Sequence, residues 1–161
     1  MREPWPHCEE KSMKTAIVYV SVHHGNTRKV AQAMAEELEA VLFDLTEEKN
    51  PDLSGYELVG FASGVFYHGL HETMRGYLEN LSLPRGQKFF LAATCGVAYM
   101  DYTRGTKKLL EGKGGQCVGS FQCRGFDTFG PFGKIGGIAK GRPNEKDLER
   151  ARAFARKISA R

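Results

Sequence analysis

The chain has 161 residues, which is enough for one domain with a substantial core, and nothing in its composition requires two. Hydrophobic residues make up 41% and charged residues 26%, and no apolar run approaches the roughly 20 residues of a membrane-spanning helix. The net charge of +4 comes from scattered basic residues without an aromatic-studded platform. These observations argue against nucleic-acid binding and against membrane insertion.

Two features of the whole chain bear on its boundaries and its compartment. Residues 1–12 lack the apolar h-region of a secretory signal, so we expect a flexible tail followed by one domain over residues 13–161. The cysteines show neither C-x-x-C spacing nor the density of a disulfide scaffold. This pattern weakens zinc, iron–sulfur and secreted interpretations, and we expect a cytoplasmic protein.

Apolar runs rich in β-branched and aromatic residues alternate with helical patterns along most of the chain. The runs, each predicted to be a strand, cover residues 15–20, 41–45, 57–62, 88–93 and 116–121. The intervening helices show apolar stripes, which are Val30, Met34 and Leu38, then Met74, Tyr77, Leu78 and Leu81, and finally Leu148, Ala151, Ala155 and Ile158. Between the second and third strands there is room for one or two helical turns at most.

Strands that alternate with helices predict a parallel sheet. Right-handed crossovers make 2-1-3-4-5 the simplest strand order, so we expect an α/β fold with a doubly wound, five-stranded parallel sheet and helices on both faces. Ligands in that architecture bind beyond the carboxyl ends of strands 1 and 3. Loops 21–27, 63–71 and 94–102 are predicted to meet there.

The loop over residues 21–27 joins the first strand to the first helix and is rich in hydroxyl and amide side chains. At a helix N-terminus, unpartnered N–H groups and the helix dipole hold a phosphate without a lysine. Gly25 is the only glycine of this loop. The loop therefore carries neither the dinucleotide-binding motif G-x-G-x-x-G nor the G-K-[ST] of the mononucleotide phosphate loop. No carboxylates follow strands 1 and 3, as a phospho-accepting receiver would need. The loop therefore suits a single terminal phosphate.

At this loop the chain resembles the flavodoxin family, whose first loop, Gly/Ser-x-Thr-Thr-Gly-Asn-Thr, holds the phosphate of FMN. The stretch His24-Gly25-Asn26-Thr27 matches the end of that motif, and the element order is similar over roughly residues 14–161, as in the short-chain form. The resemblance implies that the cofactor contacts Ser21, Val22, His23, His24, Gly25, Asn26 and Thr27. His23 and His24 stand where the family has threonines; a neutral imidazole still donates one hydrogen bond, and a protonated one adds positive charge.

Two further loops match the family by position. In the second, the resemblance places Ser63, Gly64, Phe66, Tyr67, His68 and Gly69 near FMN. Phe66 or Tyr67 would lie against the inner face of the isoalloxazine, although Phe66 is equally suited to the core. In the third, it places Thr94, Cys95, Gly96 and Tyr99 near FMN, with Tyr99 over the outer face. We expect Tyr102 to begin the next helix and Cys95 to be a small core or loop residue.

His68 and His71 are three residues apart and could share a helix face, and with His23 and His24 they raise a metal-site alternative. No carboxylate or cysteine spacing completes such a site. Histidines that meet at a flavin pocket are explained by the ligand alone, so we expect no metal site.

Residues 124–142 form a long glycine- and phenylalanine-rich segment after the fifth strand. Loops of this length are uncommon in compact domains and tend to carry function. We expect Phe126, Phe129 and Phe132 mainly to pack beneath the loop; a partner-docking patch and a shield for the flavin edge are the alternatives. Asn144 is expected to cap the last helix, with Asp147 in its first turn.

The resemblance implies an electron carrier that binds FMN non-covalently and exchanges electrons with redox proteins, a reductase and an acceptor, as a monomer or homodimer. No residue needs to act as an acid, base or nucleophile, because the cofactor carries the chemistry. One alternative is an FMN-dependent NAD(P)H:acceptor oxidoreductase, in which residues 124–142 build a substrate pocket or dimer contact. Another is a non-redox module for a different phosphate-bearing ligand. Because this chain is basic and the family is acidic, we expect a less negative flavin potential that rises as the histidines become protonated.

Overall fold

The structure is a computed structural model that describes residues 13–22 and 24–160, so the predicted tail over residues 1–12 falls outside the described part. Five strands run parallel in the order β2-β1-β3-β5-β6. They are β1 (Thr15–Val20), β2 (Val41–Asp44), β3 (Leu58–Phe66), β5 (Lys88–Cys95) and β6 (Gln116–Arg124). This order is the predicted 2-1-3-4-5 arrangement of the main strands, so the predicted fold is confirmed.

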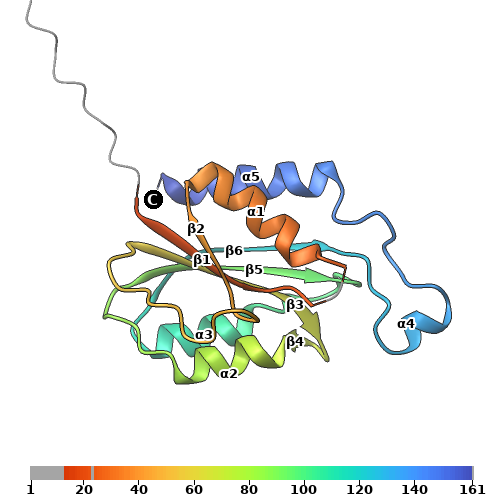
Figure 1. Ribbon diagram of the computed structural model, residues 1–161, viewed down its shortest axis with the longest axis horizontal. Helices are drawn as coiled ribbons and strands as arrows, with labels where there is room; N and C mark the ends of the chain where they lie inside the picture. Colours follow the sequence, from red (N-terminus) through yellow and green to blue (C-terminus); the bar gives the residue numbers. More distant parts are fainter. Residues whose placement is uncertain (1–12, 23, 161) are drawn as a thin grey trace, which may run out of the picture.

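Helices cover both faces of the sheet (Figure 1). One face carries α1 (Asn26–Leu38) and α5 (Glu145–Ser159), and the other carries α2 (Glu72–Asn80) and α3 (Arg104–Gly112). The one-turn α4 (Pro131–Lys134) lies apart from these layers, beyond the carboxyl ends of the strands. No helix in the described ranges is long and apolar enough to span a membrane.

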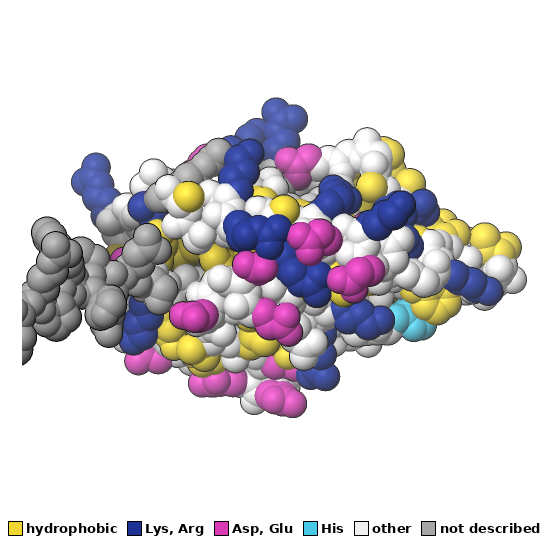
Figure 2. Space-filling model, turned by 90° about the horizontal axis from the view of Figure 1, so that it is seen from above, with side chains coloured by type: hydrophobic (Ala, Val, Ile, Leu, Met, Phe, Trp, Pro, Cys, Tyr) yellow, Lys and Arg dark blue, Asp and Glu magenta, His cyan; other side chains and the backbone are white. Residues whose placement is uncertain are grey.

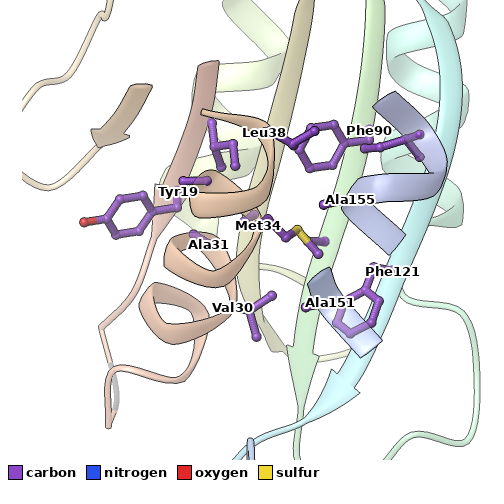
Figure 3. Close-up of a cluster of buried hydrophobic side chains, with 14 of the residues drawn as sticks. Tyr19, Val30, Ala31, Met34, Leu38, Phe90, Phe121, Ala151 and Ala155 are labelled. Carbon is purple, nitrogen blue, oxygen red and sulfur yellow. The ribbon is translucent and has the colours of Figure 1, made fainter. Parts of the chain in front are cut away.

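The core under α1 and α5 follows from the predicted stripes (Figure 3). Val30, Met34 and Leu38 are buried along α1, and Ala151 and Ala155 are buried on α5. The small alanines let the two helices lie close together over the sheet, while the Met34 side chain fills the space between them. Close packing of this kind makes the core sensitive to the loss of even one methylene.

The register of the central strands brings the site-bearing loops to one level. Val20 of β1 pairs with Ser63 of β3, and Gly64 pairs with Thr94 of β5. The loops that follow these three strands therefore leave the sheet side by side at its carboxyl edge. This is the edge at which ligands bind in doubly wound sheets.

The last helix begins as the sequence predicts. The Asn144 side chain accepts a hydrogen bond from the Asp147 backbone N–H at 3.0 Å, and the Asp147 carboxylate accepts one from the Asn144 N–H at 2.9 Å. Arg142 adds two bonds to the same carboxylate, at 2.6 and 2.7 Å. This guanidinium is the largest cause of the lowered pKa of Asp147. The end of the segment over residues 124–142 is thereby tied to α5.

The structure differs from the sequence prediction at two places. The strand predicted over residues 57–62 continues to Phe66 and folds back as the hairpin strand β4 (Gly69–Leu70). The prediction that Tyr102 begins a helix is wrong, because α3 begins at Arg104. The buried Tyr102 hydroxyl donates to the Val97 carbonyl at 2.8 Å, which holds its side chain in the loop ahead of the helix.

Candidate functional site

Four segments converge at the carboxyl edge of the sheet. They are the start of α1, the β3–β4 hairpin, the loop after β5 and the segment over residues 124–142. They enclose a cavity of about 30 Å³, which has room for about two water molecules. A cavity of this size accommodates a small polar group, whereas pockets for drug-sized ligands measure about 300–1,000 Å³. Any larger part of a ligand must therefore lie over the rim.

The start of α1 presents unpartnered backbone donors. His24 and Gly25 are left-handed, at φ 55° and 66°, and the first turn of the helix contains no acidic residue. The Arg28 N–H donates to the Ser21 hydroxyl at 3.2 Å. The N–H groups of Asn26 and Thr27 donate to no acceptor among the described residues. Together with the helix dipole, these groups make the loop a seat for an oxyanion.

A pair of hydroxyls lies beside this helix start. The side chains of Thr27 and Thr94 are bonded to each other at 2.9 Å, and the two residues are only 3% and 5% exposed. In such a pair one hydroxyl donates to the other, so one hydroxyl proton remains for a third partner. No described group accepts it. A buried, unused donor next to a helix N-terminus favours an anionic oxygen in this cavity.

The Asn26 side chain joins the α1 loop to the distant segment over residues 124–142. Its amide donates to the Phe126 carbonyl at 2.8 Å. A Cβ at Gly125 would lie 2.6 Å from the Asn26 amide nitrogen, so only glycine permits this approach. Asn26, which the sequence assigns to phosphate binding, thus also fixes the opposite wall of the cavity.

His24 also faces this wall. Its imidazole lies 4.3 Å from the Phe126 ring, centroid to centroid, and its Nε2 is 3.0 Å from the Thr128 hydroxyl. The backbone of Asp127 pairs with Ile138 through hydrogen bonds of 2.9 and 3.0 Å, which gives the segment a small closed base. His23, the neighbouring site residue of the sequence prediction, is not among the described residues.

The hairpin tip carries the aromatic residues expected from the second loop. Tyr67 and His68 form a two-residue turn, and both are left-handed, at φ 49° and 65°. A type I′ turn of this kind prefers Asn-Gly, so these side chains are held in a backbone conformation unfavourable to them. Residues other than glycine and asparagine that are held in the left-handed region of backbone conformation cluster at functional sites. Tyr67 is 85% exposed.

The rings around this tip form a connected group. Phe66 is half-buried and packs edge-on against His71 and Phe129, with centroids at 5.1 and 5.4 Å. Phe129 also lies 5.1 Å from the Tyr67 ring. The expectation that the phenylalanines of residues 124–142 pack is therefore met at Phe129, but the packing partners are site loops.

Tyr99 lies on the loop after β5, and its contact with a cofactor stays a prediction. Its side chain is 64% exposed, and its hydroxyl is 2.8 Å from His68 Nδ1. This bond links the third loop to the hairpin tip. Tyr67 and Tyr99 are thus two exposed rings on connected loops that follow β3 and β5.

Two of the remaining predicted residues, Ser63 and Cys95, are buried, and their contact with a cofactor stays a prediction. Ser63 is buried; its hydroxyl donates to the Gly64 carbonyl at 2.8 Å and accepts from the His71 N–H at 3.0 Å, which braces the hairpin containing Gly69. Cys95 is buried, and burial raises the pKa of its thiol to about 11. At neutral pH it is a thiol, which is a poor nucleophile.

Gly96 and Val22 are the last two predicted positions that the structure describes. A Cβ at Gly96 would lie 2.5 Å from the Asp127 carboxylate, so glycine lets the third loop meet the segment over residues 124–142. Val22 lines the cavity and is 46% exposed. Sequence reasoning missed Phe126, Asp127 and Phe129 as components of the site. The glycines on either side of them were the available signal.

The structure separates His68 and His71, which the sequence suggested could share a helix face. His68 is on the hairpin tip, whereas His71 caps α2 by accepting the Thr73 N–H on Nδ1 at 3.0 Å. Across residues 13–22 and 24–160, no three histidine, cysteine or acidic side chains gather as metal ligands.

Comparison with known proteins identifies the family of this fold. Residues 16–124 match the model of a flavodoxin domain. Over 148 residues the chain is 33% identical to an uncharacterized protein of Methanocaldococcus jannaschii, and the match covers 91% of this chain and 98% of that protein.

Solved flavodoxin structures share the architecture at low sequence identity. A flavodoxin from the domain Archaea superposes with a TM-score of 0.67 at 17% identity, over 91% of this chain and 96% of that one. Oxidised flavodoxin 2 from Bacillus cereus gives 0.69 at 20% identity, over 91% and 98%. The sheet order, the site at its carboxyl edge and the matched residues agree: the chain belongs to the flavodoxin domain family, whose members typically bind FMN.

Proposed function

We propose that this protein binds FMN non-covalently at the carboxyl edge of the sheet and carries electrons between redox proteins. The observation that carries the proposal is the cavity beside α1, which Asn26, Thr27 and Thr94 line and where the Thr27–Thr94 pair keeps one hydroxyl proton with no described acceptor. The N–H groups of Asn26 and Thr27, which donate to no acceptor among the described residues, belong to the same helix start. These donors match the oxygens of one terminal phosphate. The small volume of the cavity fits a phosphate better than a ring system.

The residues present fit the remainder of the cofactor as well. Tyr67 and Tyr99 supply exposed aromatic faces, which favour stacking with a flat ring by about 0.5–1.5 kcal/mol beyond the area that they bury. When bound, FMN supplies the redox chemistry by accepting and releasing electrons. The chain's own groups bind and orient it: backbone N–H groups and hydroxyls hold the phosphate, and Phe129 supports the hairpin that carries Tyr67.

Two nucleophilic side chains among the described residues of the site, Cys95 and Ser63, are poorly suited to covalent catalysis. The Cys95 thiol is buried, with its pKa raised to about 11, and its Sγ lies 3.5 Å from the Cys123 carbonyl. The Ser63 hydroxyl is engaged on both sides. Neither side chain is paired with a base that would activate it as a nucleophile.

The hydroxyl pair offers a direct test. We expect Thr27→Val and Thr94→Val each to weaken FMN binding by about ten-fold or more, because a hydrogen bond to a charged group contributes about 1.5–3 kcal/mol. Quenching of FMN fluorescence measures the affinity. Thr73→Val, at an exposed position on α2, is the matched control and should leave the affinity unchanged. A wild-type chain that leaves FMN fluorescence unquenched would contradict the proposal and favour a different phosphate-bearing ligand.

One observation favours a second candidate, an FMN-dependent NAD(P)H:acceptor oxidoreductase. A groove of about 470 Å³ runs between α2 and α3 from His68. Arg75, Arg104 and Lys108 line it, together with two carboxylates. Its volume lies within the usual range for small-molecule sites, and its cations suit a nucleotide phosphate. Steady NAD(P)H oxidation by the purified flavoprotein, without an added reductase, would establish this activity in place of the carrier role.

A further inference from the structure

We propose that the carboxyl edge of the sheet is a docking face for an acidic redox protein. The inference deepens the proposed function and rests on it, because it names the class of partner with which the site exchanges electrons. The docking face consists of residues 21–28, 63–71, 94–100 and 124–142, with His23 outside the described part. The partner follows from the charge, exposed apolar surface and pairing of these residues.

The docking face is nearly free of carboxylates. In sequence, its four segments hold a single acidic residue, Asp127, whose carboxylate accepts the Phe129 N–H at 2.8 Å. The same segments hold five permanently cationic residues, which are Arg28, Arg124, Lys134, Lys140 and Arg142. These four segments therefore carry a net positive charge, whereas Asp44, Glu47 and Glu48 at the carboxyl end of β2 lie beyond β1 at the same edge of the sheet. A surface of one sign attracts partners of the opposite sign and raises their rate of association.

Two exposed cations of the face have no carboxylate partner among the described residues, and a third cation, Arg124, is half-buried and donates to the Gly96 carbonyl at 2.8 Å. Arg28 pairs with Asp44, and Arg142 pairs with Asp147. Lys134 and Lys140 are exposed, and no carboxylate of the described chain lies within ion-pair distance of either. Both belong to the segment over residues 124–142, which also carries Phe129 against the hairpin tip. They are free to meet the carboxylates of a partner.

The helical face over α1 and α5 shows the opposite arrangement (Figure 2). There Arg152 bonds Glu145 at 2.8 Å, and Arg156 bonds Glu37 at 2.8 Å and Glu149 at 2.9 Å. Figure 2 shows acidic and basic side chains interspersed over these helices, whereas the end away from the grey tail shows yellow, dark blue and cyan without magenta. On α5, Arg152 and Arg156 are paired with neighbouring carboxylates, whereas Lys134 and Lys140 of the docking face have no ion-pair partner among the described residues.

Exposed apolar side chains gather on the same face. The large hydrophobic residues exposed there are Val22, Tyr67, Val97, Tyr99, Met100 and Ile135. Elsewhere in the described chain, only Val41 and Leu109 are exposed to this degree. Ile135 is 72% exposed and sits next to Lys134 on the protruding α4 turn. An apolar centre with charged residues around it is typical of protein interfaces, and it favours a protein over a small anion.

Two carboxylates lie just outside the docking face, and the net charge of the face itself remains positive. Glu72 and Asp101 lie at the starts of α2 and α3, just beyond two of the segments. The Asp101 carboxylate is engaged by the N–H and hydroxyl of Thr103, at 2.9 and 2.6 Å. An anionic membrane is the less favoured occupant, because the only helix on the face, α4, has four residues and offers no amphipathic surface.

The experiment uses an acidic [2Fe–2S] ferredoxin as the probe. Its binding to the full chain is measured by interferometry, and its rate of electron transfer is measured by stopped flow with the FMN-loaded chain. In the transfer step, one electron leaves the reduced iron–sulfur cluster, which becomes oxidised, and enters the FMN, which is reduced. We expect saturable binding and a bimolecular rate that falls as ionic strength rises.

Matched variants locate the contact. Lys134→Glu with Lys140→Glu should lower the transfer rate by about five-fold or more at low ionic strength. Lys146→Glu with Lys157→Glu, exposed on α5, changes the net charge equally and should lower it by less than about two-fold. Ile135→Ser should weaken binding, whereas Val41→Ser, at the opposite end of the sheet, should not. Reduction of the flavin by a neutral deazaflavin radical and FMN affinity should be the same in every variant.

The outcomes separate this proposal from the proposed function. Even if FMN binds, three results would overturn the docking face. They are an equal fall of the transfer rate in the two double lysine variants, a rate independent of ionic strength, and no ferredoxin binding. A chain that does not bind FMN contradicts the proposed function, while ferredoxin binding lost in Lys134→Glu with Lys140→Glu would still support the face. Sedimentation with phosphatidylglycerol vesicles, or a dimer broken by Ile135→Ser, would overturn it in favour of a membrane or of a second copy.

Discussion

The face that α1 and α5 cover and the segment over residues 124–142 are built in different ways. Val30 and Met34 on α1, and Ala151 and Ala155 on α5, repeat at helical spacing and are wholly buried. In the segment, the conformation depends on glycine contacts, on the Asn26 bond to Phe126 and on Phe129 against the hairpin. We therefore expect truncations in the first region to lower stability and truncations in the second to lower ligand affinity. Substitutions should therefore separate the two properties.

Met34→Ala is expected to have the largest effect on stability. The side chain is completely buried between α1, α5 and the sheet, so its truncation leaves a cavity and should cost about 3–4 kcal/mol of the free energy of unfolding. Denaturant titration measures this loss, and FMN affinity below the transition should be unchanged. Met100→Ala, at an exposed methionine, should change stability by less than about 0.5 kcal/mol. A large loss of FMN affinity in Met34→Ala would contradict the expectation that stability and FMN binding depend on different regions.

Asp147→Asn tests the junction between the two regions. The Arg142 bonds lower the pKa of Asp147, so the stabilisation is present above the unfolded pKa of about 3.9 and is lost as pH falls through the lower folded value. We expect the variant to be about 2–3 kcal/mol less stable at neutral pH and the difference to shrink in acid. Denaturant titrations across this range measure it. Glu145→Gln is the control, and a difference that persists undiminished in strong acid would contradict the assignment.

Phe129→Ala should have the opposite effect to Met34→Ala: a small loss of stability and a clear loss of FMN affinity. The ring is half-buried and makes edge contacts with Phe66 and Tyr67, so its loss should cost only about 1 kcal/mol of stability. FMN affinity should fall about five-fold because the hairpin loses its support. Fluorescence titration beside thermal unfolding gives both values. Phe132→Ala, in the same segment, should leave affinity unaltered; equal affinities in the two variants would place Phe129 outside the site.

Tyr67→Asn should have the smallest effect on stability and a clear effect on binding. Asparagine tolerates the left-handed backbone at this turn better than tyrosine does, which offsets the lost ring contact with Phe129. We expect the free energy of unfolding to stay within about 0.5 kcal/mol, while FMN affinity falls by about five-fold or more through loss of an aromatic face. Tyr56→Asn, remote from the site, is a control for aromatic loss. Unchanged FMN affinity in Tyr67→Asn would exclude Tyr67 from the flavin site.

The same contrast explains how far the sequence could be interpreted. Val30, Met34 and Leu38 at helical spacing predict a buried helix face, and Asn144 with Asp147 predicts a capped start; both are local patterns. The hairpin turn could not be predicted because Tyr67 and His68 occupy positions where a turn of this type usually has asparagine and glycine.

The assembly of the site required contacts that are remote in sequence. His24 and Thr128 are 104 positions apart, and Asn26 and Phe126 are 100 apart. No local pattern encodes such pairings. The phosphate loop was predictable because its chemistry lies within a few residues at one helix start, whereas the opposite wall of the cavity was not.

A spectroelectrochemical titration of the FMN-loaded chain, repeated between about pH 5.5 and 8, tests the central claim most directly. We predict reversible reduction of bound flavin at a potential less negative than in acidic flavodoxins, because Asp127 is the one acidic residue among the described residues that line the cavity. Because reduction of the flavin itself takes up protons, the potential is compared at each pH with that of free FMN. Absence of bound flavin, or a potential as negative as in acidic flavodoxins across this range, would contradict the prediction.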